Sequence, residues 1–219
     1  VLLLSVGGCT SFELFRRWVV SDKKILELEK ATKQAELQQL KKQINPHFLF
    51  NMLNNANILV KDAPDEASQI LEKLDNLLRY QLNDSTRREV FLTADIQFLT
   101  SFLELEKVRR DHFEYTIFQE GNMENICIPP LLFIPFVENA VKHNLDSDNL
   151  SYVHLYFSVH NKQLTFRCEN SKPRVPVKRE GGIGLANVKR RLDLLYESRY
   201  TLQIEDKETT YNVNLHLNL

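Results

Sequence analysis

The sequence predicts an α+β protein in which a helical N-terminal part precedes a sandwich of strands and helices. Residues 22–83 place apolar side chains three to four residues apart, as helices with one buried face do. Four segments after residue 110 instead alternate apolar and polar side chains, which is typical of half-buried strands. Helical spacing returns between those strands. Strands with helices packed on one face describe a two-layer sandwich.

Composition narrows the class of protein. The 219 residues suffice for one mid-sized domain with an extension or for two small domains, and an apolar content of 43% supports a real core. The formal net charge of −1 argues against nucleic-acid binding through bulk positive charge. Three widely spaced cysteines form neither a metal pattern nor a disulfide framework, so a reducing cytosol is favoured.

The N-terminal segment 1–21 resembles the end of a membrane helix followed by a juxtamembrane stretch. "VLLLSVGGCTSF" is apolar, but twelve residues are too few to span a bilayer. Arg16, Arg17, Lys23 and Lys24 follow, and such basic residues would place the rest of the chain in the cytosol. Two alternatives stay open: a buried helix end, or a lipoprotein cleavage site at "VGGC".

Residues 22–44 are rich in charge and contain neither glycine nor proline. Two apolar stripes run along this segment, and they do not share one register. One consists of Ile25, Leu28, Thr32 and Ala35, and the other of Leu37, Leu40 and Ile44. This pattern predicts a signalling coiled coil with a phase break, in which the helix pairs with a second copy. A single solvated helix is the alternative.

Residues 45–87 predict a dimerising helical hairpin. A helix over 47–60 is followed by a turn at 62–65, where Asp65 is expected to cap a second helix over 66–83. Six apolar residues of that helix are expected on one face: Ala67, Ile70, Leu71, Leu74, Leu77 and Leu78. Two helices joined by a short turn form an antiparallel hairpin, and a second copy would complete a four-helix bundle.

A proline interrupts the helical run immediately before a histidine, in "QINPHFLFN". Pro46 removes a backbone donor and is expected to loosen the helix there. His47 and Asn51 are four residues apart and therefore share a helix face. A neutral imidazole is a good nucleophile that could accept a phosphoryl group, and Asn51 could orient a water that removes it. The alternative for His47 is a hydrogen-bonded core histidine.

The remaining residues, 88–219, predict the sandwich itself. Helices are expected near 93–109, 130–146 and 184–197. Alternation marks strands around Tyr115 and Ile117, over 153–159, over 164–168 and over 213–219. The basic stretch 171–183 is a loop by composition.

The helix containing "FIPFVENAVKHNL" gathers polar side chains after an apolar first half. Glu138 and Lys142 are four residues apart, as are Asn139 and His143. A carboxylate, an amide and a lysine on adjacent faces suit a magnesium ion that bridges phosphates. A solvated helix end with an ordinary ion pair is the alternative.

A glycine-rich junction, "GGIGLANVKRRL", precedes the helix that begins near Leu185. Backbone N–H groups at a helix N-terminus attract anions, and glycines allow phosphates to approach closely. Lys189, Arg190 and Arg191 add positive charge after it. The alternative is a plain loop-to-helix junction.

Three motifs in this order resemble a known family. "LKKQINPHFLFNMLNN", "IPPLLFIPFVENAVKHN" and "GGIGLANVKRRLDLLY" are similar to the signatures of LytS/YehU-type bacterial sensor histidine kinases, whose catalytic domain has the GHKL ATPase fold. The resemblance covers about residues 22–219. It implies ATP-dependent autophosphorylation of His47 and transfer to an aspartate of a response regulator. It also implies a homodimer at the bacterial inner membrane, with this portion in the cytoplasm.

The resemblance also implies roles for individual residues. Asn139 would coordinate Mg²⁺, with Lys142 and His143 near the phosphates of ATP, while Gly182, Gly184 and Leu185 would belong to the ATP lid. The adenine-binding box departs from the family pattern: "CENSKP" lacks its glycine, and either Glu169 or Asn170 could bind adenine. Phe48 stands where many histidine kinases have an acidic base, so we expect Glu138 to act as the base.

Two other functions compete with this one. The weakened adenine box would suit a nucleotide-binding or dimerising module with degenerate kinase activity. An ATP-hydrolysing chaperone or repair protein of the same fold is the second alternative, although a histidine-bearing hairpin before the ATP-binding domain argues against it.

Overall fold

The computed structural model describes residues 46–144, 150–173 and 183–219, together with five isolated positions, Arg16, Trp18, Lys23, Lys24 and Thr32. The predicted membrane-helix end at 1–21 and the predicted coiled coil at 22–44 lie outside the described segments. Residues 44–219 form one compact unit. Within the described segments, no helix has both the length and the apolar character needed to cross a membrane.

The unit begins with two antiparallel helices, α2 (Pro46–Asp62) and α3 (Pro64–Asn83). The turn between them is a single residue, Ala63, whose N–H donates to the Leu59 carbonyl at 2.8 Å. Because Pro64 opens α3 and Ala63 occupies the N-cap position, the prediction that Asp65 caps this helix is wrong. Asp65 lies in the first turn instead, where its charge favourably meets the positive end of the helix dipole.

Helix α3 carries apolar side chains on two sides. Its buried side consists of Ala67, Ile70, Leu74, Leu77 and Tyr80. Leu71 is 46% exposed and Leu82 is 63% exposed, so they belong to a second apolar side. The prediction of one shared face is therefore wrong for Leu71, because positions 70 and 71 point about 100° apart around a helix.

The sheet has five strands in the order β2-β4-β5-β7-β6. Their bounds are β2 (Phe113–Gly121), β4 (Ser151–His160), β5 (Gln163–Ser171), β6 (Tyr200–Asp206) and β7 (Thr210–Asn218). Strands β2 and β4 are parallel, and the other neighbours pair antiparallel. The alternation predicted for β4, β5 and β7 is present, because every second side chain enters the core.

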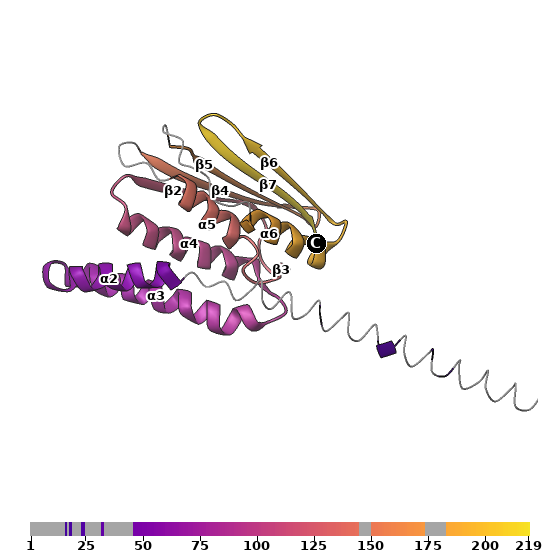
Figure 1. Ribbon diagram of the computed structural model, residues 1–219, viewed down its shortest axis with the longest axis horizontal. Helices are drawn as coiled ribbons and strands as arrows, with labels where there is room; N and C mark the ends of the chain where they lie inside the picture. The colour runs from indigo at the N-terminus through magenta and orange to yellow at the C-terminus, as the bar shows by residue number, and fades with distance from the viewer. Residues whose placement is uncertain are drawn as a thin grey trace, which may run out of the picture. The chain divides into compact units, whose positions relative to one another are not determined.

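Three helices cover one face of this sheet: α4 (Leu92–Arg109), α5 (Ile134–His143) and α6 (Ile183–Tyr196) (Figure 1). The α2–α3 hairpin packs against α4 on the side away from the sheet. Aromatic rings join helices and sheet, since the Phe133 ring lies 4.5 Å from that of Phe166 and 5.2 Å from that of Phe157. The predicted α+β arrangement, with helices on one face of a sheet, is confirmed.

Three strands and one helix boundary differ from prediction. Strands β1 (Val90–Phe91) and β3 (Cys127–Ile128) pair with each other but are too short to show a period, as is the 3₁₀ turn Asp84–Thr86. The edge strand β6 was missed although Tyr200, Leu202 and Ile204 alternate with polar residues, and it is mostly exposed. Helix α5 begins at Ile134 rather than near residue 130, because Leu131 adopts a left-handed conformation with φ of 56°.

Candidate active site

Helix α5 supplies the polar residues that the sequence singled out. Its apolar side chains, Ile134, Phe136, Val137, Ala140 and Val141, are buried in the core. The polar residues therefore lie along the edge of the helix, where Glu138, Asn139 and His143 are half-buried and Lys142 is exposed. Such an edge can present an amide, a carboxylate and a cation to one ligand.

Glu138 faces the helical hairpin. It lines a small pocket between hairpin and α4–α5, together with Phe48, Leu49, Leu77, Gln81, Phe98, Phe102 and Ile134. This mostly apolar surrounding disfavours the charged form, and burial raises the pKa of Glu138 to about 7. A carboxyl group with a pKa near neutrality can both accept and release a proton at physiological pH.

The segment directly after His47 forms the other wall of this pocket. His47 is the second residue of α2, and its side chain lies outside the described part of the structure. Phe48 packs on Phe102 of α4 with ring centroids 4.8 Å apart. Asn51, one turn further on, is half-buried. The structure thus brings the predicted phosphoacceptor segment and the predicted base to the same junction.

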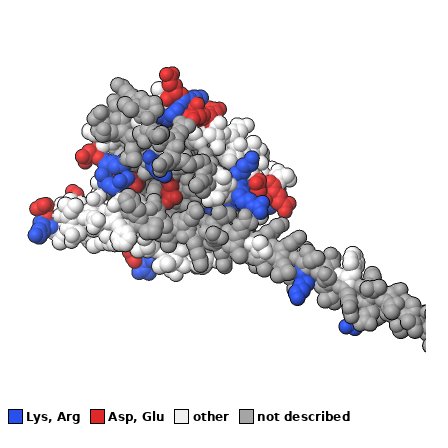
Figure 2. All heavy atoms as spheres, viewed as in Figure 1, with Lys and Arg blue, Asp and Glu red and all other residues white. Residues whose placement is uncertain are grey.

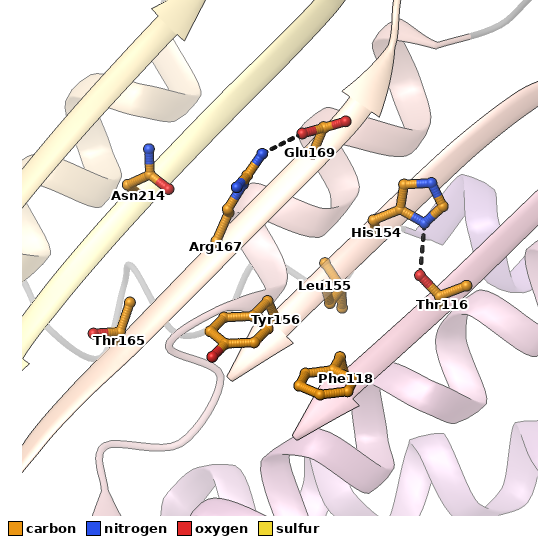
Figure 3. A pocket seen from close by; sticks show the side chains of 9 residues that line it. All are labelled: Thr116, Phe118, His154, Leu155, Tyr156, Thr165, Arg167, Glu169 and Asn214. Carbon is orange, nitrogen blue, oxygen red and sulfur yellow. Dashed lines mark hydrogen bonds and ion pairs between the residues drawn. The ribbon is translucent and has the colours of Figure 1, made fainter. Parts of the chain in front are cut away.

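Strand β5 separates the two candidates for adenine recognition. Asn170 is 1% exposed and shares the helix-facing side of the sheet with Cys168. Glu169 lies on the opposite side, where Arg167 donates to it at 2.5 Å (Figure 3). The Tyr152 hydroxyl also donates to Glu169, at 3.4 Å. The structure therefore does not bring Glu169 together with α5, because the sheet stands between them.

The glycine-rich junction is only partly described. Gly184 and Leu185 lie in the first turn of α6, and Gly182 lies outside the described residues. Lys189 is exposed. Arg191, expected to add positive charge for phosphates, is only 4% exposed, and its guanidinium donates to the carbonyls of Pro130 and Leu131. Arg191 therefore ties α6 to the loop before α5 and does not face solvent.

The donor set bears on magnesium. Across 46–144, 150–173 and 183–219 no group of three or more His, Cys, Asp or Glu residues could hold a metal ion. Asn139 offers one amide oxygen on α5. This fits an ion held mainly by nucleotide phosphates and water, which is the coordination that Mg²⁺ commonly adopts.

Two buried polar residues near the candidate site, Asn144 and Asp95, were missed from the sequence. Asn144 accepts from the Arg110 guanidinium at 3.1 Å and 3.2 Å and donates to the Tyr152 carbonyl at 3.1 Å, which fixes the end of α5 to β4. Asp95 is fully buried on α4. A carboxylate within the apolar run "ADIQFLTSFL" was the signal for this buried charge, because such residues are rarely buried without a partner.

Comparison with known proteins finds similarity to histidine kinases. Residues 35–113 match the family model described as histidine kinase. The chain is 30% identical over 203 residues to the sensor protein LytS of Staphylococcus haemolyticus, a match that covers 86% of this chain and 35% of that protein. It is 32% identical over 119 residues to the sensor histidine kinase YpdA of Escherichia coli, covering 54% of this chain and 21% of that protein.

The matched relatives are much longer than this chain, which spans about a third or less of their length. Among solved structures, histidine kinase ThkA in complex with response regulator protein TrrA matches at 15% identity with a TM-score of 0.45. That match covers 89% of this chain and 66% of the other.

Proposed function

The chain carries a histidine kinase family region at residues 35–113 and resembles LytS-type sensor proteins over most of its length, and from this premise we propose that it autophosphorylates on His47 with ATP. The phosphoryl group then passes to an aspartate of a response regulator in a two-component system. The observation that carries this proposal is the Glu138 carboxyl group, whose pKa is about 7, in a pocket lined by the residues directly after His47.

The chemistry follows from these two groups. A ring nitrogen of His47 attacks the γ-phosphorus, an N–P bond forms, the bond from the γ-phosphorus to the bridging oxygen breaks, and ADP leaves. The imidazole must lose a proton as the N–P bond forms, and Glu138, which lines a pocket with Phe48 and Leu49, would take it. Phe48 occupies the position where an acid would otherwise stand, and its ring instead holds the segment against Phe102.

Nucleotide binding is assigned to the helix-facing side of the sheet. Asn139 would hold Mg²⁺, which when bound neutralises phosphate charge and so lowers the barrier to phosphoryl transfer. Lys142 and His143 follow on α5 at the phosphate end. Asn170 is favoured over Glu169 for adenine because it shares the side of the sheet that α5 covers. A box with asparagine and without glycine remains compatible with hydrogen bonding to an adenine amino group.

The glycine segment would form the lid over the phosphates through Gly182, Gly184 and Leu185. Asn51 lies one turn after His47 on α2 and would orient the water in the reverse, phosphatase direction. Both roles rest on the motif resemblance together with the placement of α2 and α6 in one compact unit.

A homodimer is supported by the second apolar side of the hairpin. Phe50, Ile58 and Leu82 are each more than 60% exposed in the single chain. Figure 2 shows the visible part of the hairpin largely free of charged side chains away from its tip. Covering such a surface with a second copy would remove apolar area from water and complete a four-helix bundle. Domain boundaries near residues 22, 45 and 88 are part of the same proposal.

The membrane location is proposed from the motif resemblance and from the basic residues that follow the apolar N-terminal segment. We assign the protein to the bacterial inner membrane, to which its N-terminal region would attach it. The hairpin and the ATP-binding domain would lie in the cytoplasm and receive the signal through the coiled coil. No nucleic acid is expected as a partner, since the formal net charge of the chain is −1. Figure 2 shows acidic and basic side chains near one another on the described part of the visible face.

The test is incubation with Mg²⁺ and γ-labelled ATP. Wild type should incorporate acid-labile, base-stable phosphate, His47→Ala should incorporate none, and Asn139→Ala should lose both labelling and ATP binding. Label that persists in His47→Ala would refute the assignment of the nucleophile. ATP binding without labelling in the wild type would favour the degenerate module, and phosphate release without labelled protein would favour a chaperone-type ATPase.

A further inference from the structure

One buried carboxylate joins the hairpin to the loop that opens α5. Asp95 of α4 is 0% exposed. Its Oδ1 accepts from the hydroxyl of Tyr80 on α3 at 2.6 Å and from the backbone N–H of Leu131 at 2.9 Å. A single oxygen atom therefore contacts the hairpin on one side and the segment three residues before α5 on the other.

Helix α6 also contacts the loop before α5, through Arg191. Arg191 of α6 donates through Nη1 to the Leu131 carbonyl at 2.6 Å and through Nη2 to the Pro130 carbonyl. Leu131 has a φ of 56°, a conformation that costs free energy for a residue other than glycine and persists where its surroundings hold it. Asp95 holds its N–H and Arg191 holds its carbonyl, so both contacts set where α5 begins.

The hydrogen-bond network of Tyr80, Asp95, Leu131 and Arg191 depends on each of its residues. Burial raises the pKa of Asp95, while its hydrogen bonds and the Arg191 charge act in the opposite direction. Burial lowers the pKa of Arg191, and Asp95 opposes that change. Buried charges are tolerated only where hydrogen bonds and opposite charges compensate for lost water, so removal of one partner is felt by the others.

We propose that Asp95 is a positioning residue that couples docking of the hairpin to the placement of α5, with the Tyr80 hydroxyl as the hairpin's half of the contact. The inference rests on the proposed autophosphorylation. The Tyr80 ring stacks on Phe98 with ring centroids 4.7 Å apart, and this apolar contact alone fixes the orientation of α3 against α4 only weakly. The hydrogen bond from Tyr80 to Asp95 fixes that orientation, and the same Asp95 oxygen binds the N–H of Leu131, seven residues before Glu138. Docking and alignment of the base are thereby one event.

Tyr80→Phe tests this coupling, because it removes the hydroxyl and keeps the ring. Tyr200→Phe is the matched control, since the Tyr200 hydroxyl also donates to a carboxylate at 2.6 Å, that of Asp193 on the exposed surface. We expect the maximal rate of His47 labelling to fall about tenfold in Tyr80→Phe, the size expected when a buried acceptor loses one hydrogen bond. The ATP concentration for half-maximal rate should stay unchanged, as should both properties in Tyr200→Phe.

A merely structural role would instead change thermal stability and the ATP dependence together, leaving the maximal rate of the folded fraction intact. A Tyr80→Phe protein that labels at the wild-type rate would overturn the coupling while the kinase assignment stands. If wild type itself takes no label on His47, the proposed function fails, and hydrogen exchange of α4 decides the docking question without catalysis. Faster exchange over 92–105 in Tyr80→Phe than in Tyr200→Phe supports the contact, and equal exchange excludes it.

Discussion

Replacing Glu138 with glutamine is expected to stabilise the fold at alkaline pH and to slow the proposed labelling of His47 at least about a hundredfold. Glutamine has nearly the same shape and cannot ionise. Moving a carboxyl pKa from 4.5 to about 7 corresponds to about 3 kcal/mol of folding free energy, an upper figure for a half-buried group. The free energy of unfolding of the wild type is therefore lower by up to this amount at pH values where Glu138 is ionised.

The direction of the pH dependence follows from the raised pKa. Below pH 4.5 the carboxyl group is protonated in both folded and unfolded chains, so it contributes no difference. Between pH 4.5 and about 7 the unfolded chain ionises first, and the stability of the wild type falls. Above that range the loss is complete. The advantage of Glu138→Gln should thus be near zero at pH 4.5 and reach up to about 3 kcal/mol at pH 8.

Urea unfolding at several pH values measures this difference. Glu72→Gln, the same substitution at an exposed position of α3, is the matched control and should change the free energy of unfolding by no more than about 0.5 kcal/mol. In the same preparations, His47 labelling by the wild type should increase through pH 7 as Glu138 ionises, whereas Glu138→Gln should bind ATP and label at least about a hundredfold more slowly. A stability difference that does not change with pH, or labelling at an unchanged rate, would refute the reasoning.

Three further changes have defined outcomes. Gly121→Ala should lower the free energy of unfolding by more than about 1 kcal/mol in thermal melts, because Gly121 has a φ of 88° and an added Cβ would lie 2.3 Å from the Val159 carbonyl oxygen of β4; an unchanged melting temperature would contradict this. Asn170→Ala should weaken ATP binding about tenfold by calorimetry, while Glu169→Ala on the other side of the sheet should leave it unchanged, and the reverse result would reassign adenine recognition. Leu82→Lys should raise the dimer dissociation constant more than tenfold in sedimentation, since each protomer loses about one buried leucine; an undisturbed dimer would place its interface elsewhere.

Elements whose burial has a period could be predicted from the sequence. Strands β4, β5 and β7 alternate because one side faces helices and the other faces water. The motif around His47 and the "ENA" helix were identifiable because chemically distinctive residues lie within one or two helical turns. Such signals are local, so a single sequence contains them.

The missed features depend on contacts between distant positions. Glu169 and Asn170 are neighbours in sequence, and only the side of the strand that each occupies decides which can meet a nucleotide bound near α5. Arg191 belongs to a basic run that suggested a phosphate site, yet it is buried because two backbone carbonyls of the loop before α5 need a donor. Neither outcome has a periodic signature, since each is fixed by strand alternation or by long-range packing.

The position after the phosphoacceptor links these observations. An acid at residue 48 could serve as the base from within the hairpin, but it could not make the ring contact that Phe48 makes with Phe102. With phenylalanine there, the hairpin gains apolar packing against α4, and the proposed base comes from α5 instead. Catalysis then depends on the relative placement of α2 and α5, which is what the Tyr80–Asp95–Leu131 contact controls. A signal that shifts the whole hairpin against α4 would break both the Tyr80 hydrogen bond and the Phe48–Phe102 ring contact. A kinase that carried its base on the hairpin would be less sensitive to that shift.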